Sequence, residues 1–313
     1  MNRTGTLEDG GGSGGVGKAR KPPRHRIARS LLVGFLLGYG ALVIPLYFGQ
    51  EQLIFPGHSS QGAPEAGFKA PAGAELVPLR ARNDQIFALY GPALTPAGKP
   101  RPDAAHCPTL LYFYGNGTWL AVSLGTFAYL RRLGVNVLIP EYAGYGMSTG
   151  AVGEAGCYAA ADAAYEYLTR TRHVPTRQLI VVGGSLGGAV AIDLAARKPV
   201  AALATFSTFT SMCDMAGVLT PWAPAQLLLR HRFESAQKIR RVKAPIFVAT
   251  GDADGFVPPQ MSARLAAAAG RPVTRLLVHG AEHGSLPTNG TPEFDTVLQA
   301  FVERVRRSQA DAR

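Results

Sequence analysis

Charged residues are scarce in this sequence of 313 residues. Lys, Arg, Asp and Glu together make up 17% of the chain, whereas hydrophobic residues make up 47%. Such a composition is too apolar for a disordered chain and excludes a collagen-like or coiled-coil protein. The chain is therefore expected to fold around a packed hydrophobic core.

Cysteine is rare as well. The three cysteines, Cys107, Cys157 and Cys213, form no Cys-x-x-Cys pair, which excludes a zinc ribbon and a redox dithiol motif. If the domain is exported, one disulfide can form and leave one thiol over, but the sequence does not choose the pair.

Acidic residues are outnumbered, because 32 Lys and Arg against 21 Asp and Glu give a net charge of +11. Residues 1–29 hold seven of the basic and two of the acidic residues, so nearly half of the excess lies in this segment. The rest of the chain has no basic stripe interleaved with aromatic residues and no nucleic-acid motif. We therefore expect no nucleic-acid partner.

No charged residue lies between Arg29 and Glu51, and Leu31–Phe48 is an apolar run. At about 1.5 Å per residue in a helix, this stretch is long enough to cross the hydrocarbon core of a bilayer, which is about 30 Å thick. A cleaved signal peptide is the alternative, but its apolar region is usually shorter and is followed by a small-residue cleavage site. Residues 30–50 are therefore predicted to be an uncleaved membrane anchor.

The charges on the two sides of this anchor predict its orientation. Basic residues precede it, and only Lys69 appears in the twenty or so residues that follow. Because Lys and Arg near a span resist translocation, residues 1–29 are predicted to lie in the cytoplasm. The glycine-rich, basic composition of this tail predicts that it is disordered. Residues 51–313 are then a folded domain on the outer side of the cell membrane, attached by a single pass.

The folded domain alternates short apolar runs with helical stretches. Such runs are typical of a mostly parallel sheet covered by helices on both faces, which is an α/β fold. Glu75–Arg80 and Gln85–Tyr90 are expected to form an antiparallel pair ahead of it. The predicted strands are Leu110–Tyr114, Val135–Ile139, Leu179–Val182, Ala201–Phe206, Ile246–Thr250 and Arg275–Val278. The predicted helices are Leu120–Leu133, Glu154–Thr171, Leu186–Arg197, Met261–Ala269 and Pro292–Arg306.

A longer gap interrupts this alternation between the strands that end at Phe206 and begin at Ile246. Residues 207–244 are predicted to form a small cap over the sheet edge, and an ordinary crossover with one or two helices is an equal alternative. The gap carries the basic residues Arg230, Arg232, Lys238, Arg240, Arg241 and Lys243. These form either a solvated face or a surface that rests on anionic lipid.

The strand at Leu179–Val182 runs into Gly183-Gly184-Ser185-Leu186-Gly187-Gly188 and then into a helix. This is the Gly-x-Ser-x-Gly pattern between a strand and a helix, where a sharp turn exposes the serine and leaves no room for side chains at the two glycines. Ser185 is therefore the candidate nucleophile. A phosphate-binding turn stays open as an alternative, because glycine-rich turns between strand and helix also bind phosphates.

A serine nucleophile needs a histidine, and the histidine needs a carboxylate to orient it. Among the seven histidines, His283 lies in a polar loop beyond the last strand, whereas His279 is at the strand end itself, so His283 is the better candidate. The strand at Ile246–Thr250 opens into a loop with two competing acids, Asp252 and Asp254. Serine, acid and histidine then follow in the order of an α/β-hydrolase.

From about Tyr47 to Arg306 the chain resembles the α/β-hydrolase family and, within it, the membrane-anchored, Bem-like serine hydrolases. The resemblance is carried by QEQLIFPG (50–57), FYGNG (113–117), PEYAGYGMSTG (140–150), GGSLGG (183–188), the segment 227–245, GDADGFVPP (251–259) and GAEHG (280–284). In this family the acid lies in Gly-x-x-Asp-x-x-Val-Pro. This pattern matches Asp254 and leaves Asp252 as a loop-capping residue.

The resemblance also implies the remaining parts of the site. It places an oxyanion hole at the backbone N–H groups of Asn116 and Leu186, although Tyr114 stands where the family usually has histidine. It further implies cleavage of carboxylic esters or thioesters with no metal and no organic cofactor. A peptidase or amidase with the same triad, and a non-catalytic interaction protein on this scaffold, are the alternatives. The oligomeric state is not indicated by the sequence.

Overall fold

The computed structural model describes residues 24–310. The chain divides into two compact units, of which the first ends at Leu46 and the second is Tyr47–Arg313. Helix α1 (Arg24–Ile54) begins within the segment predicted as a tail, and residues 1–23 of that segment lie outside the described residues. Among the described residues, one helix, His25–Ile54, is long and apolar enough to cross a membrane. A signal sequence has the same properties.

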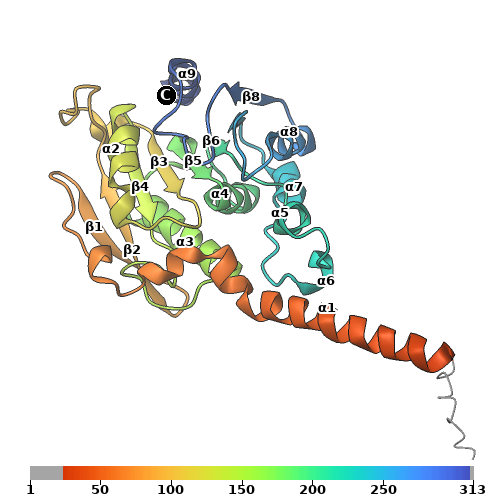
Figure 1. The fold of residues 1–313 in the computed structure, drawn as a ribbon. Coiled ribbons are helices and arrows are strands. Elements are labelled where there is room, and N and C mark those ends of the chain that lie inside the picture. The colour runs from red at the N-terminus through yellow and green to blue at the C-terminus, as the bar shows by residue number, and fades with distance from the viewer. Residues whose placement is uncertain (1–23, 311–313) are drawn as a thin grey trace, which may run out of the picture. The chain divides into compact units, whose positions relative to one another are not determined.

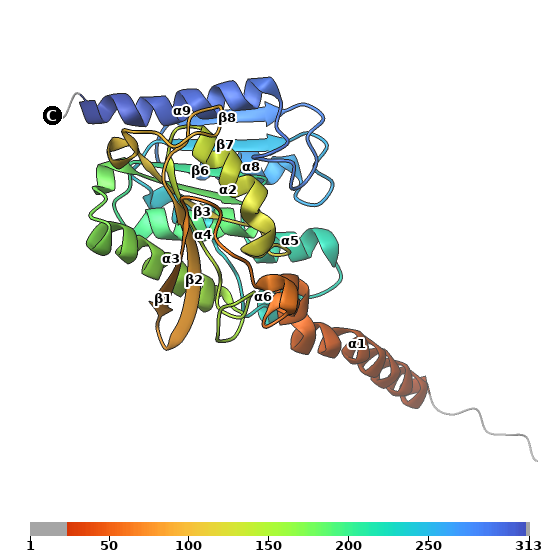
Figure 2. The same cartoon turned by 90° about the vertical axis from the view of Figure 1, so that its left-hand side faces the viewer.

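The second unit is built on an eight-stranded sheet in the order β1-β2-β4-β3-β5-β6-β7-β8 (Figures 1 and 2). The strands β1 and β2 form the expected antiparallel hairpin, β2 pairs antiparallel with β4, and all later pairs are parallel. The predicted α/β fold with a mostly parallel sheet is confirmed. The strands are β1 (Glu75–Ala81), β2 (Asp84–Gly91), β3 (Thr109–Phe113), β4 (Asn136–Pro140), β5 (Leu179–Gly184), β6 (Ala202–Phe206), β7 (Ile246–Gly251) and β8 (Val273–Val278).

Helices cover both faces of the sheet (Figure 1). On one face Tyr129 of α2 donates a hydrogen bond to Asp295 of α9, and on the other Arg197 of α4 pairs with Asp162 of α3. The central strands β3 to β7 are buried along almost their whole length, which explains their continuous apolar sequences. The helices of these layers are α2 (Leu124–Arg132), α3 (Glu154–Glu166), α4 (Leu186–Arg197), α8 (Pro259–Ala268) and α9 (Pro292–Ala310).

The helices differ from the prediction mainly at their ends. A 3-10 turn, Ala121–Ser123, precedes α2, and a π turn, Tyr167–Thr171, follows α3. The three cysteines are buried and free, so the disulfide considered from the sequence does not form.

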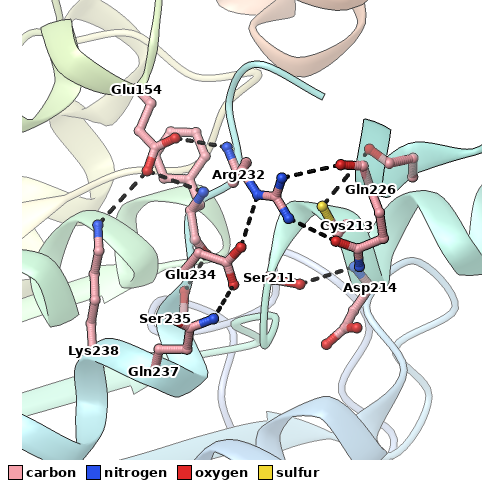
Figure 3. Close-up of polar contacts among 12 residues, drawn as sticks. Glu154, Ser211, Cys213, Asp214, Gln226, Arg232, Glu234, Ser235, Gln237 and Lys238 are labelled. Carbon is pink, nitrogen blue, oxygen red and sulfur yellow. Dashed lines mark hydrogen bonds and ion pairs between the residues drawn. The ribbon is translucent and has the colours of Figure 1, made fainter. Parts of the chain in front are cut away.

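The segment 207–244 forms three short helices, α5 (Met212–Leu219), α6 (Ala225–Leu228) and α7 (Ser235–Lys238), and the 3-10 turn Ile239–Arg241. Glu154, at the start of α3, fixes this segment to the body of the domain (Figure 3). Its carboxylate accepts the backbone N–H groups of Arg232, at 2.7 Å, and of Phe233, at 3.1 Å. Phe233 is fully buried and has a positive φ of 43°, so the chain turns sharply at this attachment.

Half of the basic residues in this segment form ion pairs within the domain. Arg230 pairs with Glu51, Arg232 with Glu234, and Lys238 with Asp193 at 2.7 Å. Arg240, Arg241 and Lys243 are exposed. Of the three paired residues, Lys238 is withdrawn from solvent, with a side chain 17% exposed, whereas Arg230 and Arg232 keep side chains 46% and 41% exposed.

Candidate active site

Ser185 lies on a strained turn between β5 and α4. Its backbone has φ 51° and ψ −120°, and its N–H donates to the carbonyl of Phe206 at the end of β6 at 2.8 Å. A Cβ on Gly183 would clash with the backbone of Gly187, and a Cβ on Gly187 would clash with the carbonyl oxygen of Phe113. The flanking glycines are therefore required by close backbone approach, and a non-glycine residue with positive φ is a conformation held by its surroundings.

The same turn places Ser185 at the N-terminus of α4, where it is the residue before the first helical position. The first backbone N–H groups of a helix have no partner within the helix, and the N-terminal end carries a partial positive charge. Leu186 occupies the first helical position, so its N–H is available for an anionic oxygen beside Ser185.

His283 and Asp254 form a pair in the loops that follow β8 and β7. The Nδ1 atom of His283 lies 3.0 Å from Oδ2 and 3.1 Å from Oδ1 of Asp254. The Asp254 side chain is completely buried, and the side chain of His283 is 25% exposed. Burial acts to raise the pKa of Asp254, but the hydrogen bonds from His283 and from the Val257 N–H outweigh it and leave the pKa below its usual 3.8. The carboxylate is therefore ionised and holds the histidine.

The two other candidates from the sequence also form a pair. Nδ1 of His279 lies 2.8 Å from Oδ2 of Asp252, whose Oδ1 accepts the N–H of Gly280. This second pair is at the surface, since the side chain of His279 is 80% exposed. Of the two histidines, His283 lines the cavity that contains Ser185. The structure thus brings Ser185 and His283 to one cavity and holds Asp254 behind His283, with Asp252 and His279 in a separate, exposed pair.

The cavity has a volume of about 410 Å³ and lies at the carboxyl edge of the sheet. Its walls come from the loop after β3, the start of α2, the turn at Ser185 and the loop that carries His283. Among the described residues from 207 to 244, only Ser207 lines it. The lining residues are Tyr112, Tyr114, Gly115, Asn116, Gly117, Thr118, Val122, Ser123, Thr126, Gly184, Ser185, Phe206, Ser207, His283, Gly284, Leu286 and Thr288.

Asn116 lines the cavity from the loop that follows β3. Within the described residues, no hydrogen bond uses its backbone N–H, which leaves this donor available. Tyr114 is fully buried, and its ring packs against Tyr142 at a centroid distance of 4.8 Å. The tyrosine that replaces the usual histidine therefore fills the core beneath the loop.

Ser207, which the sequence patterns did not single out, follows β6 and lines the same cavity. This residue is buried and has a positive φ of 46°. Its position directly after a parallel strand was the available signal, because such strand ends meet at the catalytic edge. Among the described residues, no group of three or more His, Cys, Asp or Glu is arranged to hold a metal ion.

Comparison with known proteins identifies relatives along most of the chain. The family model of the alpha/beta hydrolase fold matches residues 108–236. An uncharacterized protein of Mycobacterium tuberculosis is 33% identical over 241 residues, which cover 77% of this chain and 83% of that protein. The protein bem46 of Schizosaccharomyces pombe is 31% identical over 226 residues, which cover 68% of this chain and 73% of that protein.

Solved structures share the fold at low sequence identity. An alpha-beta hydrolase from Vibrio vulnificus matches with a TM-score of 0.59 and 20% identity, covering 74% of this chain and 81% of that chain. An esterase from Pyrococcus furiosus matches with a TM-score of 0.59 and 16% identity, covering 74% of this chain and 92% of that chain. At such identities the likeness shows a common architecture.

Proposed function

Because this chain belongs to the α/β-hydrolase family and to its Bem-like branch, we propose that it is a serine hydrolase that cleaves carboxylic esters or thioesters. The proposal rests above all on one observation: Ser185, on a strained turn, shares a cavity with a histidine that a buried carboxylate holds. This arrangement has the parts that a serine nucleophile needs.

In the proposed reaction, Ser185 Oγ attacks the acyl carbon of the substrate. An ionised Asp254 only accepts hydrogen bonds, so Nδ1 of His283 carries a hydrogen and Nε2 is left to take the proton from Ser185. The protonated histidine then donates that proton to the departing alcohol or thiol. Asp254 stabilises the imidazolium that forms between these two steps.

The negative oxygen of the tetrahedral intermediate is proposed to bind the N–H groups of Asn116 and Leu186. Each such donor contributes about 3 to 4 kcal/mol when it is aimed at the developing charge. Water, activated by His283 in the same manner, then attacks the acyl-enzyme and releases the acid. The reaction needs no metal or organic cofactor for any of these steps.

The test is turnover of short p-nitrophenyl esters and of the matching thioesters by the wild-type protein and by Ser185→Ala. Serine-dependent release of the alcohol or thiol supports the proposal. Serine-dependent cleavage of a p-nitroanilide with no cleavage of esters would indicate an amidase or peptidase instead. Inactivity of a folded wild-type protein toward all three would indicate a non-catalytic protein on the hydrolase scaffold.

We also propose that α1 anchors the domain in the cell membrane, with the N-terminus in the cytoplasm and the hydrolase domain outside. Support comes from the hydropathy of the helix and from the basic residues that precede it. The hydrolase domain would then lie on the periplasmic or extracytoplasmic side, and protease added to cells with an intact cell membrane but no outer envelope should digest it. Protection from protease would contradict the orientation, and an intact mass that lacks the N-terminal residues would identify a cleaved signal sequence.

A further inference from the structure

The residues at the end of α1 contact the loop that carries Asn116. Asn116 Nδ2 donates to the carbonyl of Ile54, the last residue of the helix, at 2.9 Å. In return, the backbone N–H of Gly57 donates to the Asn116 carbonyl at 3.0 Å. Because the last carbonyls of a helix have no partner within it, Asn116 caps α1 while α1 holds Asn116.

The Asn116 carbonyl accepts a second hydrogen bond, which is the third that holds this residue. Tyr145, in the loop after β4, is fully buried and donates its O–H to the Asn116 carbonyl at 2.9 Å. Its ring lies directly against Gly57, where a Cβ would clash with both Tyr145 and the Asn116 carbonyl. The side-chain amide and the carbonyl of Asn116 are thus both fixed, whereas its N–H has no hydrogen-bond partner among the described residues and the residue itself lines the cavity.

The same end of α1 also holds the segment 207–244. Gln50 Oε1 accepts the backbone N–H of Arg230 at 2.9 Å, and the ring of Phe55 packs edge-on against His231 at 5.1 Å. Residues 50–57 therefore connect the loop of the proposed oxyanion hole with the segment across from it. They lie within the second unit and are buried in part, which distinguishes them from the exposed apolar residues earlier in the helix.

We propose that residues 50–57, together with Tyr145, are positioning elements of the active site that set the direction of the Asn116 N–H. This inference rests on the proposed serine hydrolase function. A donor must be aimed closely at the developing oxyanion, because displacement by about 1 Å can reduce the rate about 100-fold. Loss of one of the three tethers is therefore expected to lower the rate without removing the donor.

The experiment compares Tyr145→Phe and Asn116→Ala in the full chain in its membrane. The first removes one O–H, and the second removes the tether to Ile54 while the backbone N–H stays. Tyr165→Phe is the matched control, because Tyr165 also donates its O–H to a backbone carbonyl, that of Pro199 at 3.0 Å, away from the cavity. Complete labelling of one sample with a fluorophosphonate gives the concentration of reactive serine. Turnover of a p-nitrophenyl ester by an unlabelled sample is then divided by this concentration, and thermal unfolding is recorded for each variant.

The proposal predicts that kcat falls about tenfold in Tyr145→Phe and in Asn116→Ala, with KM changed less than about twofold, and that Tyr165→Phe keeps the wild-type kcat. If both variants lose thermal stability but keep the wild-type kcat per labelled serine, the tethers are only structural and the proposal is wrong. If the wild-type chain itself has no turnover that depends on Ser185, the proposed function fails and this inference fails with it.

Discussion

Asp254 holds His283 through both oxygens of its carboxylate, with Nδ1 of the histidine 3.0 Å from Oδ2 and 3.1 Å from Oδ1. The carboxylate itself cannot rotate freely, because its Oδ1 also accepts the backbone N–H groups of Phe256 at 3.0 Å and Val257 at 2.8 Å. The loop after β7 thus fixes the acid, and the acid fixes the imidazole. A fixed imidazole is what a general base beside Ser185 requires.

Replacing Asp254 with asparagine should lower kcat by about 1,000- to 10,000-fold. The two backbone N–H groups would hold the amide oxygen in place of Oδ1, so the amide nitrogen would face His283 and donate to Nδ1. The proton of the neutral imidazole would then be on Nε2, where a base for Ser185 must be free. Ester turnover by the purified variant measures the effect.

Asp252→Asn is the matched control for this change. Its carboxylate pairs with the exposed His279, and exposed pairs contribute little, so kcat should stay within about threefold of wild type. If Asp252→Asn were the more damaging of the two, the assignment of the acid would be overturned.

The glycines around Ser185 should differ in their tolerance of alanine. In Gly187→Ala the new methyl group would meet the backbone at the end of β3, which should lower the free energy of unfolding by about 2 to 3 kcal/mol despite the better helix propensity of alanine. At Gly184 the nearest atom is the hydroxyl of Tyr112, 3.7 Å from the position of a Cβ, so Gly184→Ala should cost less than about 0.5 kcal/mol. Urea unfolding of both variants decides the point, and equal losses would argue against the packing described for this turn.

Removing the Glu154 carboxylate should loosen the segment 207–244. Glu154→Ala leaves the N–H groups of Arg232 and Phe233 without their acceptor, and the expected loss is about 2 to 4 kcal/mol of unfolding free energy. Hydrogen exchange at these two amides should speed up as well. Glu166→Ala, in the same helix, breaks only an exposed ion pair with Arg170 and should cost less than about 0.5 kcal/mol. Unchanged exchange at Arg232 and Phe233 would be incompatible with this role of Glu154.

Glu141 should make stability depend on pH. Burial raises the pKa of its carboxyl from 4.5 to about 7, although hydrogen bonds from the N–H groups of Leu120 and Met147 oppose the rise. Between these values the folded protein keeps a proton that the unfolded chain releases. The free energy of unfolding that this bound proton contributes is therefore fully present below about pH 4.5 and is lost as the pH rises through about 7. The loss is at most about 3 kcal/mol.

The variant Glu141→Gln isolates this contribution, because its side chain does not titrate. From pH 5 to pH 7.5 the unfolding free energy of the wild type should fall relative to that of the variant. Parallel pH profiles for the two proteins would show that Glu141 does not titrate in this range.

Much of the fold was predictable because the central strands are buried on both faces and have unbroken apolar sequences, as in Leu179–Val182 and Ile246–Thr250. The turn at Ser185 was also recognisable, since its glycines are dictated by local backbone contacts. The choice between Asp252 and Asp254 was not local, because each of the two acids pairs with a histidine. The resemblance to the family pattern favoured Asp254, and in the structure Asp254 is the acid whose side chain is fully buried.

Contacts between residues far apart in the sequence were beyond prediction from patterns. The bond from Asn116 to Ile54 joins positions 62 residues apart, and that from Glu154 to the Arg232 N–H joins positions 78 apart. In both cases the polar side chain is of a common type, and the residues around it in the sequence do not indicate its hydrogen-bond partner. The pairing of Lys238 with Asp193 likewise removed part of a basic surface that sequence alone left as an open alternative.

The most direct test of the proposed nucleophile is covalent labelling of the full chain with a fluorophosphonate probe, with the modified residue located by mass spectrometry. Wild-type protein should be labelled on Ser185, and Ser185→Ala, folded to the same extent, should not be labelled. Labelling that persists in Ser185→Ala, or a folded wild-type protein that takes up no label, would contradict the claim that Ser185 is an activated nucleophile.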